Sequence, residues 1–180
     1  MAALVSKTDL LGALAGRRIV KVRRQLFVDD YNFYDPQIRD QEADGPTEIT
    51  TDDGLVFSVV GNTEEMAIEV VEGPMTEVGP SFANQEVSSN QFWSSRIDKT
   101  IVAVDVLQSI HEAPNVQAAF GIEVFLNRAD SFVIEYLSDE EHVDQTRVTG
   151  PYSGPPCRRI RIEGPTNPRT NERTRGLSSN

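Results

Sequence analysis

The sequence predicts a mainly β protein of the α+β class, with one N-terminal helix and about seven antiparallel strands in a curved sheet or half-open barrel. Three observations support this fold class. Apolar residues alternate with polar ones over most of the chain, as they do in strands with one buried face. Gly, Pro, Asn and Asp interrupt these runs at short intervals. Helical spacing of apolar residues is strongest near the N-terminus.

The expected helix begins with a capping box from Ser6 to Asp9, because Ser6 can accept a hydrogen bond from the Asp9 backbone N–H while the Asp9 carboxylate reaches back. Gly16 supplies a left-handed stop. The apolar stripe of this helix consists of Leu10, Leu11 and Leu14. A helix this short needs packing against another element to persist.

Strands follow after Gly16. The expected strands, in chain order, lie at 19–28, in a hairpin over 48–60 that turns at Asp52-Asp53-Gly54, at 66–70, at 101–107, in a hairpin over 120–136, and at 158–162. Two longer stretches rich in turn residues, 29–47 and 73–91, are expected to be loops.

A weak internal repeat runs through these strands. Arg18–Val22 followed by Glu48–Phe57 is similar to Lys99–Val104 followed by Glu123–Phe132. One interpretation is a pair of similar antiparallel units, and the other is the general similarity of strand-rich sequences. Both interpretations predict the same fold class.

The 180 residues are enough for one domain. We place this domain at 1–144, followed by an Arg-rich extension at 145–180. A last strand is expected at 157–163. The tail at 164–180 has almost no apolar content, which predicts that it is either flexible or ordered by a partner.

The formal net charge of −11 is unevenly distributed. Residues 29–86 hold fifteen acids and one base, Arg39, and carry −14. Residues 145–180 carry +5, so that 1–144 carry −16. An asymmetry of this kind can steer a charged partner, whereas the simpler interpretation is that the acids maintain solubility.

Composition and motifs exclude several classes of protein. One cysteine cannot form an internal disulfide bond or a Cys-rich zinc site. The acidic balance argues against a generally basic nucleic-acid binder. The phosphate-binding loop, the dinucleotide-binding glycine motif and the Gly-x-Ser-x-Gly nucleophile motif are all missing from the sequence.

The remaining catalytic and metal candidates each have a simpler interpretation. His111-Glu112 lacks the second histidine of a metalloprotease helix. Cys157 is either a thiol activated by neighbouring arginines or a small apolar filler. The acidic run 139–144 is either a calcium or magnesium site or a solvated surface. Asp105 is expected on a half-exposed sheet face. We therefore predict no enzyme activity, no cofactor and no metal.

The N-terminus lacks the unbroken apolar stretch of a secretory signal, because Lys7 and Asp9 interrupt it. No run of apolar residues approaches the roughly 20 that a membrane-spanning helix needs. The expected location is the cytoplasm.

The segment Asp29-Asp30-Tyr31-Asn32-Phe33-Tyr34-Asp35-Pro36 is the strongest candidate for partner recognition. Tyrosines provide rigid contact area, and carboxylates accept paired hydrogen bonds from arginine. The alternative is that Phe33 and one tyrosine anchor a loop to the core. The candidate partner-binding residues are Asp29, Asp30, Tyr31, Phe33, Tyr34, Asp35, Asp52, Asp53, Arg158, Arg159 and Arg161.

The leading functional hypothesis is a non-enzymatic binding protein whose acidic face neutralises a basic protein partner, as bacterial immunity-like inhibitors of cationic toxins do. One alternative is an assembly protein whose basic tail docks on an acidic neighbour, including a second copy of the chain. The other is a metal-dependent hydrolase. Binding to a membrane is not expected, and binding to nucleic acid is expected only through the C-terminal tail.

Overall fold

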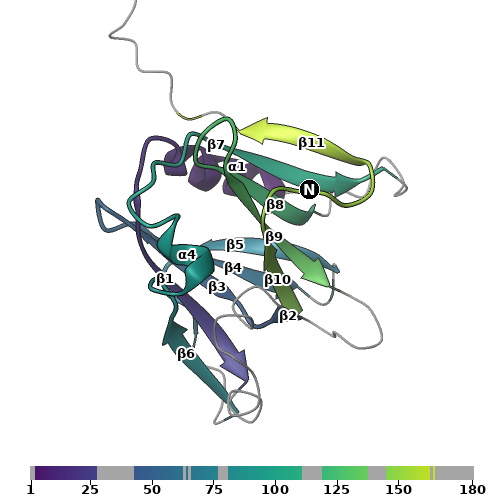
Figure 1. The fold of residues 1–180 in the computed structure, drawn as a ribbon. Coiled ribbons are helices and arrows are strands. Elements are labelled where there is room, and N and C mark those ends of the chain that lie inside the picture. Colours follow the sequence, from purple (N-terminus) through teal and green to yellow (C-terminus); the bar gives the residue numbers. More distant parts are fainter. Residues whose placement is uncertain are drawn as a thin grey trace, which may run out of the picture.

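The computed structural model describes residues 3–27, 43–62, 64, 66–76, 81–110, 119–137, 145–162 and 164. Two open antiparallel sheets lie one above the other in these residues, with a helix of 12 residues at one side (Figure 1). The predicted fold class, mainly β with one N-terminal helix, is confirmed.

The first sheet has the strand order β5-β4-β3-β1-β6. Its strands are β1 (Ile19–Phe27), β3 (Thr47–Thr51), β4 (Val56–Asn62), β5 (Ala67–Glu72) and β6 (Phe82–Glu86). The second sheet has the order β11-β7-β8-β9-β10-β2. Its strands are β7 (Ala103–Ser109), β8 (Ala119–Phe125), β9 (Ser131–Leu137), β10 (Gln145–Thr149), β11 (Cys157–Ile162) and the short β2 (Ala43–Asp44).

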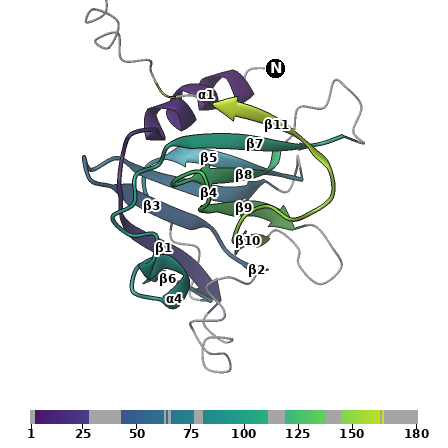
Figure 2. The ribbon, with the colours of Figure 1, turned by 45° about the horizontal axis from the view of Figure 1, so that its top comes forward.

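Helix α1 (Ala3–Leu14) begins before the expected capping box, so the prediction that Ser6 starts the helix is wrong. The predicted stop is confirmed, because Gly16 has a φ of 90°, which a residue without a Cβ adopts at little cost. The helix lies beside β7 and β11 at one side of the sandwich (Figure 2). A second, short helix, α4 (Gln91–Ser94), follows β6.

The core lies between the two sheets, because the inner faces of both contribute to one apolar cluster. The alternation in the sequence produces this arrangement, since every second side chain of each strand points inward. Trp93 of α4 is fully buried and packs edge-on against Phe132 of β9, with 5.1 Å between ring centroids. Leu11 and Leu14 of α1 join the same cluster.

Apart from the short β2, which adds to β10, the two sheets share one topology. In each, four strands form an antiparallel meander, and a fifth strand pairs with the first. Residues 73–76 follow β5 and contact the outer face of the first sheet at Glu48. Residues 150–156 connect β10 to β11 and contact the outer face of the second sheet at Glu123. We call these segments the first strap and the second strap.

The two units meet at a symmetric ribbon. Arg18, just before β1, pairs with Thr100, just before β7. The Ile19 N–H donates to the Lys99 carbonyl at 3.0 Å, and the Ile101 N–H donates to the Arg17 carbonyl at 2.8 Å. Equivalent residues thus bond to each other reciprocally, as a local two-fold axis between Arg18 and Thr100 requires.

Residues Gly16 and Asp98 occupy matching places beside this axis, and both have positive φ values of 90° and 62°. Their N–H groups make matching bonds, from Gly16 to the Ile101 carbonyl at 2.8 Å and from Asp98 to the Ile19 carbonyl at 2.7 Å. The repeat that the sequence suggested is therefore a structural repeat of two similar β units.

Three regions differ from the expected elements. The stretches 29–47 and 73–91, expected to be loops, contain β2 and β6. Strands β10 and β11 lie beyond the boundary placed at residue 144, and both pair within the second sheet. The expected strand at 157–163 is observed as β11, with Ile162 inward and Arg159 and Arg161 half-exposed.

Candidate binding surface

The acidic and aromatic segment of the sequence, which includes Asp29, Asp30, Tyr31, Phe33, Tyr34 and Asp35, lies outside the described residues. The same holds for His111, for the acidic run 139–144 and for the tail from residue 165. The described residues do show how the chain is held directly before and after residues 28–42 and directly after residues 138–144.

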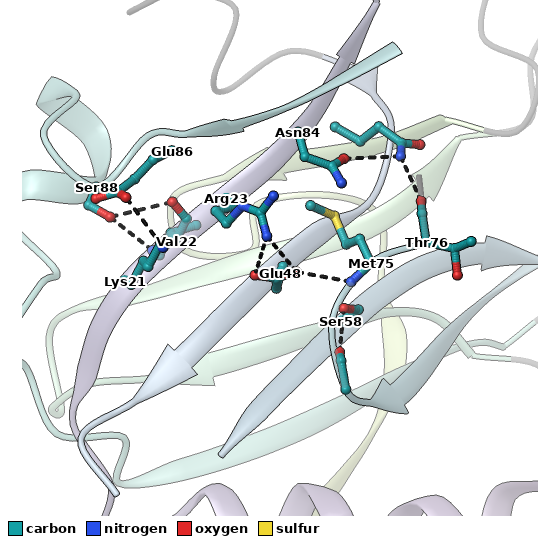
Figure 3. Close-up of polar contacts among 12 residues, drawn as sticks. Lys21, Val22, Arg23, Glu48, Ser58, Met75, Thr76, Asn84, Glu86 and Ser88 are labelled. Atoms are coloured by element: carbon teal, nitrogen blue, oxygen red, sulfur yellow. Dashed lines mark hydrogen bonds and ion pairs between the residues drawn. The ribbon is translucent and has the colours of Figure 1, made fainter. Parts of the chain in front are cut away.

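A hydrogen-bonded cluster around Gly45 ties the two sheets together, and we call Arg24, Gln25, Gly45, Thr76 and Thr146 the Gly45 hub. The Gly45 N–H donates to the Gln25 carbonyl at 3.1 Å. The Gly45 carbonyl accepts from the Thr146 hydroxyl at 2.8 Å and from Arg24 Nη2 at 3.2 Å. The Gln25 side-chain amide donates to the Thr76 carbonyl at 3.0 Å (Figure 3).

The hub depends on two unusual residues. Arg24 is fully buried, and its guanidinium also donates to the Thr146 carbonyl at 3.2 Å, so that carbonyl dipoles stabilise the buried cation. A Cβ on residue 45 would lie 2.7 Å from the Gln25 carbonyl oxygen. Glycine at this position therefore permits the close approach of β1 to the chain that precedes β3.

Three segments outside the described residues are joined to the hub. Residues 28–42 connect Phe27 to Ala43, residues 77–80 connect Thr76 to Ser81, and residues 138–144 connect Leu137 to Gln145. Their formal charges are −4, −1 and −4, which is −9 of the chain's −11. We call these three segments the acidic rim. The three segments that carry most of the net charge are thus attached to the fold near one hydrogen-bonded cluster.

The predicted binding residues Asp52 and Asp53 form the turn between β3 and β4, where the chain's own arginines contact them. Arg18 donates to Asp52 from its backbone N–H and from Nε, each at 3.0 Å, and the backbone bond is the main reason that the pKa of Asp52 lies below its ordinary value. The Thr51 hydroxyl lowers the pKa of Asp53, which also pairs with Arg17 at 2.6 Å. This turn is separate from the Gly45 hub.

The predicted residues Arg159 and Arg161 lie on the outer face of β11, above two buried acids. Arg161 Nε is 2.5 Å from Asp105, and Arg159 contacts both Asp105 and Glu123. Asp105 is 3% exposed, so the expectation of a half-exposed face is wrong because the arginines cover it. Burial alone would lower the pKa of Arg159, but the hydrogen bond and charge of Glu123 outweigh burial and raise it. Arg158 is exposed.

Both straps are held by a glutamate that the sequence analysis did not single out. The backbone N–H of Met75 in the first strap donates to Glu48 of β3 at 2.9 Å (Figure 3). The backbone N–H of Tyr152 in the second strap donates to Glu123 of β8 at 3.2 Å. The two glutamates begin the matching segments of the internal repeat, and each pairs with an arginine, Arg23 in the first unit.

A sequence signal for the straps exists. The first strap reads Gly73-Pro74-Met75-Thr76, and the second begins Gly150-Pro151-Tyr152-Ser153. Both place Gly-Pro directly before the residue whose N–H bonds the glutamate. Comparing the stretches that follow the two predicted hairpins would have identified this pair.

No group of three or more His, Cys, Asp or Glu side chains in the described part of the chain is arranged to hold a metal ion. Among the same residues, no helix is both long and apolar enough to cross a membrane. Comparison of the chain with family models, curated proteins and solved structures gives no match.

Proposed function

We propose that this chain is a non-enzymatic protein-binding module whose acidic rim binds and neutralises a basic protein partner. The observation that carries the proposal is the Gly45 hub, which joins three segments with a combined charge of −9 to one part of the sandwich. A field of this sign speeds the encounter with a cationic surface and makes association sensitive to salt.

The residues of the rim suit this task chemically. Asp29, Asp30 and Asp35 can accept paired hydrogen bonds from arginine or single bonds from lysine. Tyr31 and Tyr34 add contact area with little loss of side-chain entropy. A cytoplasmic, immunity-like inhibitor of a cationic toxin or nuclease would need this combination of charge and aromatic contact.

The test compares two double variants that remove equal charge. Asp29→Asn with Asp30→Asn changes the rim, whereas Glu72→Gln with Asp98→Asn removes two exposed acids elsewhere. Binding of a fluorescent peptide of about ten arginines is measured at about 20 and about 200 mM salt. We expect the rim variant to weaken binding several-fold at low salt and the control variant to weaken it much less.

Equal weakening by both variants would show that net charge alone attracts the peptide, and would overturn the proposal. Binding that does not change between the two salt concentrations would also contradict it, because exposed charge pairs are screened over about 10 Å at 0.1 M salt.

A further inference from the structure

The internal repeat provides a matched pair of edge strands. Strand β6 pairs with β1 at one edge of the first sheet, and β11 pairs with β7 at the equivalent edge of the second. The registers align Glu86 with Arg161 and Asn84 with Arg159, because Arg23 faces Glu86 where Asp105 faces Arg161. Within the described residues, β11 pairs with β7 alone.

The two edges differ sharply in side chains. Strand β6 reads Phe-Ala-Asn-Gln-Glu and contains no base, whereas β11 carries Arg158, Arg159 and Arg161 within six residues. An edge strand at this position of the sheet can therefore form without arginine, as β6 does. Ion pairs with Asp105 and Glu123 give Arg159 and Arg161 a structural role. The fold does not require these two arginines to be partly exposed, nor does it require an arginine at position 158.

The outer-face arginines are held in place from below. The guanidinium of Arg161 lies 4.5 Å from the ring centroid of Phe125, and that of Arg159 lies 5.4 Å from the ring centroid of Tyr152. The side chains of Arg159 and Arg161 are 39% and 47% exposed, while those of Asp105 and Glu123 are each 4% exposed. The solvent-exposed groups on this face are therefore the guanidiniums, and contacts with the buried acids and aromatic rings fix their positions.

We propose that the edge of β11 binds an extended acidic segment of a partner protein by strand addition. Arg159 and Arg161 are two residues apart on one face, so they lie about 7 Å apart and match acids at alternate positions of an added strand. Arg158 is directed to the other face and contacts the intervening positions. Backbone hydrogen bonds supply affinity, and the arginines select for acidic side chains.

This occupant differs in charge from the basic partner proposed for the acidic rim. A second copy of the chain is disfavoured as occupant because each copy carries −11. Nucleic acid is disfavoured because its dense charge would meet the same repulsion, whereas a short peptide with alternate acids carries few charges.

The experiment uses the full chain and a fluorescent peptide of about ten residues that alternates glutamate and threonine. Arg158→Glu is the test variant, since Arg158 is exposed and its loss leaves Asp105 and Glu123 paired. Arg128→Glu is the matched control, because it makes the same charge change on the exposed turn between β8 and β9. Thermal unfolding of both variants is recorded beside the binding curves.

We expect Arg158→Glu to weaken peptide binding roughly tenfold and Arg128→Glu to weaken it less than about twofold. A peptide with N-methyl groups on alternate amides should bind much more weakly, because it cannot complete the added strand. Equal effects of the two variants, or equal binding of the methylated peptide, would overturn the proposal.

Two further results would assign the edge to a different occupant. Tighter binding of a thymidine oligonucleotide of about ten nucleotides, lost in Arg158→Glu, would overturn the proposal in favour of single-stranded nucleic acid. A concentration-dependent increase in mass, also lost in Arg158→Glu, would overturn it in favour of a second copy. We expect Asp29→Asn with Asp30→Asn to leave binding of the glutamate-threonine peptide unchanged within about twofold, so the failure of one proposal is distinguishable from the failure of the other.

Discussion

The two β units of this chain share a framework and differ in the sign of their charges. Each unit has a buried glutamate on its second meander strand, Glu48 or Glu123, and each glutamate holds a strap by a backbone N–H. In the first unit the arginine that pairs with the glutamate comes from the first strand, as Arg23. In the second it comes from the last strand, as Arg159.

At other equivalent positions, a base in one unit is replaced by an acid in the other. Arg23 of β1 corresponds to Asp105 of β7, and Glu86 of β6 corresponds to Arg161 of β11. A cross-strand ion pair is satisfied with either polarity, so the fold does not fix which strand carries the acid. The glutamate and the strap are therefore common to both units, whereas the polarity of the surrounding charges differs between them.

We expect the largest loss of stability from substitutions of core residues in the two helices, α4 and α1. Trp93 and Leu11 stand five residues before the matching positions Asp98 and Gly16, and both are buried. We expect Trp93→Ala to lower the free energy of unfolding by about 4–5 kcal/mol and Leu11→Ala by about 3 kcal/mol, because the tryptophan leaves the larger cavity. Urea unfolding followed by circular dichroism measures both values.

If Trp93→Ala is too unstable to purify, Trp93→Phe provides a smaller cavity at the same site and should still destabilise the protein more than Leu11→Val. A larger loss from the leucine substitution would contradict the idea that α4, although shorter, contributes more to the core than α1.

The next comparison concerns the two strap glutamates. Glu123 accepts from the Ser131 hydroxyl at 2.6 Å, the Tyr152 N–H and Arg159, whereas Glu48 accepts from Arg23 and the Met75 N–H. We expect Glu123→Gln to cost about 3 kcal/mol and Glu48→Gln about 1.5 kcal/mol, since more donors lose a charged acceptor in the second unit. Chemical denaturation of the single and double variants tests this order.

The double variant also tests the independence of the two units. The glutamates lie on opposite outer faces and share no hydrogen-bond partner, so the two losses should add. A double variant much less destabilised than the sum of the single variants would show that the straps are coupled through the core.

The parts of the fold that depend on local alternation could be predicted from the sequence. The hairpin turn at Asp52-Asp53-Gly54 and the alternation of Ile160 and Ile162 with the arginines of β11 both follow from side-chain period and turn chemistry. Strand β6 was missed because Ala83, Asn84 and Gln85 have low strand propensity, and the strand is held by pairing with β1.

The candidate site was less predictable because it depends on long-range contacts. The Gly45 hub joins Arg24 to Thr146, which are far apart in the sequence, and an arginine in an amphipathic strand gives no sign of complete burial. The alternation of side chains predicts correctly that Asp105 lies on the face opposite Val104 and Val106, but it does not predict how exposed that face is. Alternation does not reveal that arginines from β11 cover that face.

The smallest expected effect is the pH dependence of the two hairpin turns, which carry Asp52 in the first unit and Asn127 in the second. The ordinary pKa of Asp52, 3.8, applies to the unfolded chain, and the hydrogen bonds from Arg18 lower it in the folded protein. A carboxyl group with a lowered folded pKa stabilises the protein above the unfolded pKa, and this contribution is lost as the pH falls through the folded pKa. Asn127 holds its turn through an amide oxygen that accepts from Ala129 and Asp130 and does not titrate.

We therefore expect Asp52→Asn to reduce the loss of stability between about pH 5 and about pH 2 relative to the unchanged protein, measured by urea unfolding at each pH. The reciprocal variant Asn127→Asp should increase that loss, because the new carboxylate would accept the same two N–H groups and acquire a lowered pKa. If neither substitution changes the slope of stability against pH, the Arg18–Asp52 contact does not distinguish the acid response of the first unit from that of the second.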